Sequence, residues 1–338
     1  YFGFGKPSIT VATKPAKNYS LTWPEEIAGA AIFLISFLAV WDVYQLVPML
    51  MALGIAAVTT FVALKTWKLV KTRDQAFYGF SLRYDGKFTA MGLGFFAFAV
   101  LWIGAIAHSG WIRYQEREGV RAFENIRIPD ELALAQIDPA QWLSQAERAN
   151  IIAGKAALNT ARRTGLFEND HALPKLAWLE YLSGDTDDAV ALLAEAAARQ
   201  DGQLKALSLY YRGAILNRLG RYDEAIADLD SALGEQPDLS LAREERGVSL
   251  WQLGRKKEAI DVWKEAVHRT ASLPLANSFL AGAGEAGFDS RAERYIPNDP
   301  YFHWMLGLRL KNVGMNALAN KHFDRAIQLN PQFRSRRT

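Results

Sequence analysis

Residue patterns that could carry chemistry are few in this 338-residue sequence. Residues 282–287, GAGEAG, satisfy the glycine fingerprint of dinucleotide-binding loops. Such a loop follows a strand, whereas an alanine- and leucine-rich helical stretch precedes it here, so we interpret it as a turn between two helices. GFGKPS at Gly3 lacks the five-residue lead of a phosphate-binding loop. Neither stretch predicts a nucleotide site.

The titratable side chains do not form a catalytic or metal-binding pattern either. None of the five histidines is spaced i, i+3 or i, i+4 from another, and only His108 lies in an apolar run, too few for two axial haem ligands. The chain has no cysteine, which excludes disulfides, thiolate catalysis and iron–sulfur ligation from it. Paired carboxylates and a serine–histidine arrangement are also missing. We therefore predict no cofactor and no metal, and we do not expect an enzyme.

The first third of the chain has the composition of a membrane domain. Between residues 27 and 64 the only charged residue is Asp42. An acid in a span is a candidate functional group, but we favour a role as a cap of the turn at 42–47. A span needs about 20 apolar residues. The apolar runs thus predict three transmembrane helices, at about 23–43, 46–66 and 88–112.

Lysine and arginine in the short loops predict the orientation of these spans. The tail before the first span holds three lysines, the turn at 42–47 holds none, and the loop at 65–87 holds six basic residues. Basic loops stay on the cytoplasmic side. Everything after the third span is therefore expected in the periplasm of a bacterial inner membrane, although Arg113 and the arginines after it argue mildly against this.

The last two hundred residues repeat themselves. LGRYDEAIADLDSALGEQP from Leu219 recurs 34 positions later from Leu253, again from Val313, and more weakly from Ser183. Seven residues before the turn glycine of each copy stands another small residue, which predicts close packing of two antiparallel helices. These small residues are Ala177, Gly213, Gly247 and Gly307.

This repeated sequence pattern resembles that of the tetratricopeptide repeat family, whose units are helix–turn–helix pairs of about 34 residues. Sixty residues separate Gly254 from Gly314, which indicates a shortened unit between them, and a long amphipathic helix from Trp142 is expected to cap the array. Four regular units match, near 170–203, 206–239, 240–273 and 300–333. The predicted fold is all-α, with transmembrane helices followed by a repeat-type α-solenoid. Its expected parts are a tail at 1–22, a membrane domain at 23–112, a linker at 113–141 and a helical repeat domain at 142–338.

The resemblance implies a protein-binding groove lined by the first helices of successive units. Aromatic residues and arginine, which carry much binding energy at protein interfaces, gather at the matching positions. Ala214 and Val248 stand where family members that clamp a C-terminal carboxylate have asparagine, so an adaptor of that kind is not expected. The predicted groove residues are Lys175, Trp178, Tyr181, Tyr210, Tyr211, Asn217, Arg218, Glu244, Glu245, Trp251, Trp304 and Lys311.

Two classes of function remain open. In the first, the chain is a membrane-anchored scaffold or assembly factor that holds a partner protein at the membrane surface. In the second, it is a non-catalytic subunit of a larger membrane complex, for example a respiratory one, with cofactors on other chains. Expected partners are a protein in the groove, the lipid bilayer and, in the second class, other transmembrane subunits. The net charge of +3 gives no reason to expect nucleic acid.

Overall fold

The structure, a computed structural model, describes residues 23–43, 49–77, 80–135, 139–165 and 171–336. The tail that holds GFGKPS and most of the turn at 42–47 lie outside the described residues, as does the side chain of Asp42. Contacts divide the chain into two compact units, Tyr1–Arg113 and Tyr114–Thr338. Each unit is described by itself.

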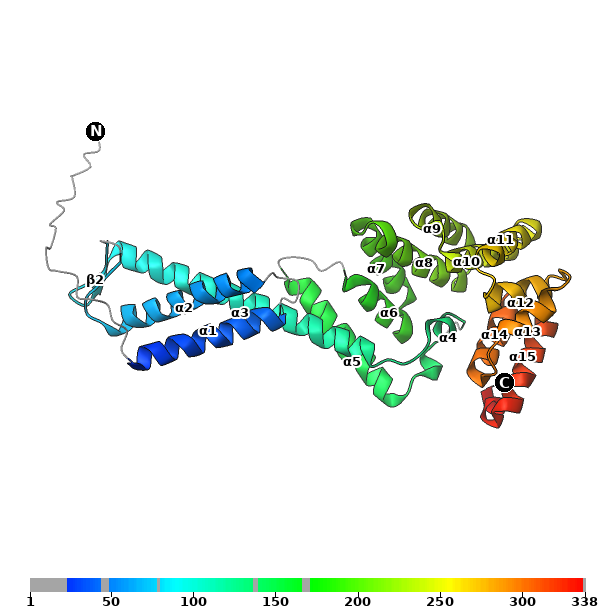
Figure 1. The fold of residues 1–338 in the computed structure, drawn as a ribbon, viewed down its shortest axis with the longest axis horizontal. Coiled ribbons are helices and arrows are strands. Elements are labelled where there is room, and N and C mark those ends of the chain that lie inside the picture. The colour runs from blue at the N-terminus through cyan, green and yellow to red at the C-terminus, as the bar shows by residue number, and fades with distance from the viewer. Residues whose placement is uncertain (1–22, 44–48, 78–79, 136–138, 166–170, 337–338) are drawn as a thin grey trace, which may run out of the picture. The chain divides into compact units, whose positions relative to one another are not determined.

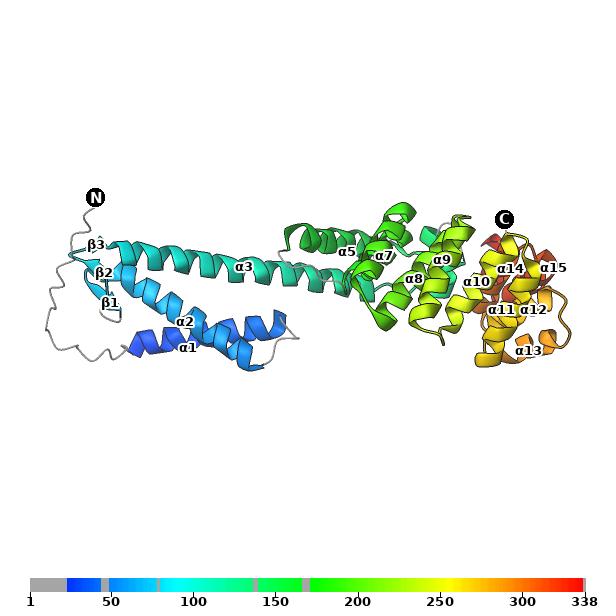
Figure 2. The same ribbon diagram turned by 90° about the horizontal axis from the view of Figure 1, so that it is seen from above.

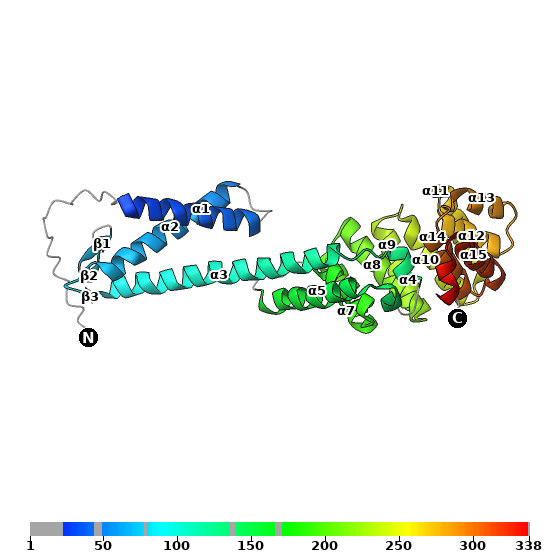
Figure 3. The ribbon, with the colours of Figure 1, turned by 90° about the horizontal axis from the view of Figure 1, so that it is seen from below.

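The first unit is built from apolar helices. Lys68 near the end of α2 pairs with Glu25 at the start of α1 at 3.1 Å, and the two helices lie side by side and antiparallel (Figure 3). All three helices are long and apolar enough to cross a bilayer. Their bounds are α1 Trp23–Val43, α2 Met49–Lys71 and α3 Ala90–Glu124.

A small antiparallel sheet between α2 and α3 was not predicted (Figure 2). Its last two strands are joined at Asp85 and Gly86, whose φ angles of 45° and 75° are those of a tight hairpin turn. Arg83 donates from Nη1 to the carbonyls of Leu69 at 3.0 Å and Val70 at 2.7 Å, and so caps the end of α2. The strands are β1 Gln75–Phe77, β2 Phe80–Tyr84 and β3 Lys87–Phe88.

The second unit is helical, and its described residues beyond 140 contain no strand, as the repeat predicts. The long helix expected from Trp142 is α5, which Ser144 caps in a reciprocal pair with Glu147. Helix pairs follow in chain order (Figure 1). The elements are α4 Asp130–Leu134, η1 Pro139–Trp142, α5 Gln145–Thr164, α6 Leu173–Ser183, α7 Thr186–Arg199, α8 Gly202–Arg218, α9 Tyr222–Glu235, α10 Ser240–Gln252, α11 Lys256–Arg269, α12 Pro274–Gly282, α13 Phe288–Tyr295, α14 Pro300–Asn312, α15 Asn316–Leu329 and η2 Pro331–Arg336.

Small residues let the two helices of each pair approach closely, as their spacing predicts. A Cβ atom on Gly213 of α8 would stand 2.7 Å from Cγ of Leu229 in α9. One on Gly307 of α14 would stand 2.5 Å from Cε1 of Phe323 in α15. Both distances are too short for real Cβ contacts, so only glycine permits this spacing between the helices.

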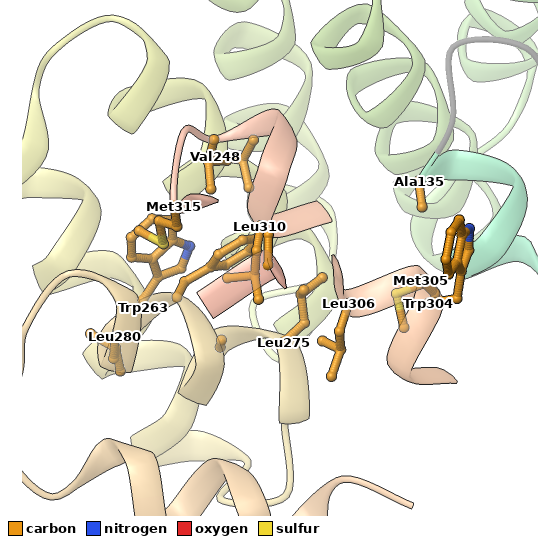
Figure 4. Packing of buried hydrophobic residues seen from close by; sticks show 14 of the residues in the cluster. Ala135, Val248, Trp263, Leu275, Leu280, Trp304, Met305, Leu306, Leu310 and Met315 are labelled. Carbon is orange, nitrogen blue, oxygen red and sulfur yellow. The ribbon is translucent and has the colours of Figure 1, made fainter. Parts of the chain in front are cut away.

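The shortened unit is present as α12 and α13, which are nine and eight residues long. GAGEAG lies at its inter-helix turn, as predicted. Because this unit is small, α14 reaches past it to α10: Trp251 donates from Nε1 to the carbonyl of Val313 at 2.9 Å. A hydrophobic cluster joins these helices and includes Trp263, Leu280 and Met315 (Figure 4).

Candidate protein-binding groove

The predicted groove residues come together on the first helices α6, α8, α10 and α14, but most of them are covered. The expectation that these side chains stand open to a partner is wrong for the buried ones, because neighbouring first helices and α4 pack over them. Their role in binding stays a prediction. Trp178, Tyr181, Tyr210, Asn217, Glu244, Glu245 and Trp304 are buried; Lys175, Tyr211, Arg218 and Trp251 are half-buried; Lys311 is exposed.

A buried ionic network centred on Glu245 joins three of these helices. Asn217 of α8 donates from Nδ2 to its Oε2 at 3.0 Å, and Arg218 pairs with the same oxygen at 3.3 Å. Arg309 of α14 pairs with the other oxygen. Burial alone would raise the pKa of Glu245, but Arg309 and Arg218 lower it below its ordinary value. Glu245 is therefore ionised and fixes α8, α10 and α14 to one another.

Glu244, the neighbour of Glu245, is in the opposite electrostatic state. Within the described residues Glu244 forms no ion pair, although the charge of Arg309 acts on it, and its Oε2 accepts from the backbone N–H of Ala276 at 3.0 Å. Burial raises the pKa of Glu244 to about 8. The two adjacent carboxyl groups thus differ in charge: Glu245 binds charged partners, and Glu244 is largely neutral at pH 7.

The α4 segment, from the linker between α3 and the repeats, lies against this face. Tyr181 of α6 donates from Oη to the carbonyl of Ala133 at 3.0 Å. Asn312 of α14 donates from Nδ2 to the carbonyl of Ala135 at 3.1 Å. Tyr211 of α8 donates to Oδ2 of Asp130 at 2.5 Å. We call the surface that α4 covers, formed by α6, α8 and α14, the inner face.

The apolar side chains of the segment are buried between two parts of the core. Leu132 and Ala135 belong to the cluster that contains Trp304 (Figure 4). Ala133 and Leu134 belong to a second cluster, with Tyr181. Burying two leucines contributes about 1.5–3 kcal/mol each, whereas fixing the backbone costs about 1–2 kcal/mol per residue. The two leucines alone therefore offset only part of the cost of ordering the five residues of α4, and the hydrogen bonds from Tyr181, Tyr211 and Asn312 must contribute to holding the segment in place.

An aromatic cluster and a small cavity lie beside the point where Asp130 docks. The rings of Trp178 and Tyr211 meet edge to face, with centroids 5.4 Å apart. Both rings line a cavity of about 110 Å³, together with Lys175 and Asp130. Burial raises the pKa of Asp130, although the hydrogen bond from Tyr211 opposes the shift. The cavity can accept a small side chain next to α4.

A histidine pair that the sequence interpretation missed lies elsewhere in this unit. Nδ1 of His303 in α14 is 3.1 Å from Nδ1 of His322 in α15, beside a cavity of about 560 Å³ that Lys321 and Arg325 also line. Burial, together with His303, lowers the pKa of His322 to about 4. The two residues are 19 positions apart, so a search for i, i+3 or i, i+4 spacing could not find them.

Comparison with known proteins identifies the repeat. Residues 175–240 match the tetratricopeptide repeat family. Similar solved structures include "Crystal structure of MamA", 15% identical, covering 56% of this chain and 96% of that one with a TM-score of 0.36. Another is "MamA AMB-1", 19% identical, covering 64% of this chain and 92% of that one with a TM-score of 0.34. No curated protein matches the sequence.

Proposed function

We propose that this chain, a tetratricopeptide repeat protein, is a membrane-anchored scaffold whose inner face holds a partner protein at the membrane surface. The observation that carries the proposal is that this face already seats a peptide segment, α4. Two of the hydrogen bonds that hold it go to main-chain carbonyls, at Ala133 and Ala135. Any peptide offers such acceptors, so these donors suit a protein ligand.

The anchor in this proposal is the set of helices α1, α2 and α3. Their length and low charge support membrane spans, and the six basic residues at 65–87 support a cytoplasmic position for that loop. Three spans would then put the repeats on the opposite side, which in a bacterial inner membrane is the periplasm. A reporter active only in the cytoplasm, fused after Thr338, should be silent, and activity would reverse this orientation.

Site-specific photo-crosslinking in native membranes tests partner binding. A photoreactive residue in place of Lys175, beside the 110 Å³ cavity, should form a defined adduct with another protein. The matched control is Lys257, which is exposed on the second helix α11 and should give no such adduct. Adducts of equal yield from both sites, or none from Lys175, would contradict binding at the inner face. A stoichiometric set of co-purifying membrane proteins would instead indicate a stable subunit of a larger complex.

A further inference from the structure

The segment that covers the inner face differs from the helices around it. α4 is five residues long, and an isolated helix of that length is not stable in water. Pro129 precedes it, and no side chain caps its first turn. Its shape therefore depends on the surface on which it lies, as the shape of a bound peptide does.

One of the three hydrophobic clusters of the repeats forms without this segment, whereas the other two include its residues. The pairing of α8 with α9 buries Ala225, Leu229 and Ala232 in a cluster to which α4 contributes no residue. α4 instead fills the space between helices that are distant in the sequence, since Tyr181 and Asn312, which both bond to it, are 131 positions apart. It lies as a wedge between these helices.

We propose that residues 126–135 are a built-in ligand of the inner face, and that the partner binds by displacing them with a segment of the same chemistry. This inference rests on the proposed function. The partner segment is a short helical turn with an acidic residue at its start and small and leucine side chains after it. It replaces Asp130 as acceptor for Tyr211 and replaces the leucines in the apolar space.

The charges around the inner face support an acidic start to that turn. The hydroxyl of Tyr211 donates to a carboxylate here, and Lys175 lines the same cavity as Asp130. Deeper in the unit, Arg218 and Arg309 both pair with Glu245, whose single charge balances only one of the two cations. The groups that bond to α4 and Ala135 are two hydroxyls and an amide, with the ammonium group of Lys175 beside the same cavity, and they suit one carboxylate and main-chain carbonyls.

Tethering makes the segment a strong competitor for the inner face. Asp130 is six residues from Glu124, the end of α3, and a ligand on a short tether competes at an effective concentration in the millimolar range. A free peptide should therefore bind the intact chain poorly and bind well once the tethered copy is disabled. This difference is the measurable signature of the proposal.

The test uses the full chain in detergent micelles and a fluorescent peptide of residues 126–135, IRIPDELALA. The double variant Leu132→Ser/Leu134→Ser should bind the peptide at least tenfold more tightly than the wild type, measured by anisotropy. The matched control Ile152→Ser, at a residue 70% exposed on α5, should behave as the wild type. A peptide with serine at both leucine positions should bind neither chain. Equal affinity of wild type and double variant, or no binding to either, would overturn the proposal.

A second measurement decides the case in which the double variant does not fold. Glu131 is exposed, and the chain has no cysteine, so Glu131→Cys places one spin label on α4 alone. Several millimolar unlabelled peptide should make this label mobile, whereas unchanged mobility would overturn the proposal. The wild-type chain could also be a dimer that becomes monomeric in the variant Leu132→Ser/Leu134→Ser. This result would assign the inner face to a second copy of the chain and would also overturn the proposal. The photo-crosslinking experiment at Lys175 separates the two proposals. Adducts with another protein would persist if only this inference fails, and they would be lost if the proposed function fails.

Discussion

Replacing Gly247 by alanine is the sharpest test of how the repeats are packed. Gly247 lies in α10 against Trp263 of α11, and a Cβ atom there would overlap Nε1 of the indole and stand 2.5 Å from its Cδ1. Trp263 is fully buried. Its Nε1 donates to the carbonyl of Glu244 at 3.1 Å, and its ring stacks on Phe279 at 4.8 Å. The ring has no free space to move into.

The loss of stability follows from these contacts. Overpacking a core by one methyl group costs about 1–3 kcal/mol, and a buried N–H that loses its acceptor costs about 1–3 kcal/mol more. The better helix propensity of alanine returns about 1 kcal/mol. Gly247→Ala should therefore destabilise the repeats by roughly 1–5 kcal/mol. For a unit of this size that lowers the melting temperature by roughly 2–20 °C.

The assay is thermal unfolding of the full chain in detergent, followed by circular dichroism at the helical band. Gly234→Ala is the matched control, because Gly234 lies inside α9 and a Cβ atom there would meet nothing within 4 Å. It should melt at or slightly above the wild type. If Gly247→Ala melts like Gly234→Ala, then α10 and α11 do not pack at this distance and the reasoning is refuted. Adding Trp263→Phe to Gly247→Ala should recover part of the loss.

Three further outcomes follow from single side chains. Arg309→Met removes one cation from buried Glu245 and should cost about 3–5 kcal/mol in a thermal melt, with part of it recovered when Glu245→Gln is added. The pKa of His322, about 4 when folded against 6.5 unfolded, means that its stabilisation is complete above pH 6.5 and lost as the pH falls toward 4. The difference in unfolding free energy between wild type and His322→Asn should therefore shrink by up to roughly 3 kcal/mol between pH 7 and 4, and a constant difference would contradict this. Arg83→Ala should speed amide exchange at the end of α2, whereas Lys87→Ala should not.

The repeat region was predictable because its packing depends on small residues and glycines at fixed, short separations along the sequence. A turn glycine with positive φ, such as Gly220 at 74°, and a small residue seven positions earlier recur in each of the four regular units and need no knowledge of distant contacts. The interval of sixty residues between Gly254 and Gly314 indicated the shortened unit. Sequence periodicity is reliable here because each pair of helices packs mainly on its neighbour.

The small sheet was missed although the chain contains a signal for it. Asp85 and Gly86 form the dipeptide that favours a two-residue hairpin, with Tyr84 and Lys87 on either side. The loop was interpreted only through its basic residues, which set the predicted orientation. One of those residues, Arg83, has a local structural role as well, since it caps α2.

The state of the inner face could not be predicted, because it depends on contacts between residues far apart in the chain. Tyr211 meets Asp130 across 81 positions, and Asn312 meets Ala135 across 177. Every residue has a main-chain carbonyl, so a hydrogen bond to that carbonyl does not require a particular side chain. The sequence therefore does not distinguish Ala133 and Ala135 from other linker residues. The repeat pattern identifies which positions face inward, but not whether a ligand or the chain itself lies over them. Some repeat proteins carry a linker with leucine and acidic residues next to the first unit. In such a protein one should therefore check whether the linker itself covers the groove before the groove aromatics are assigned to a partner.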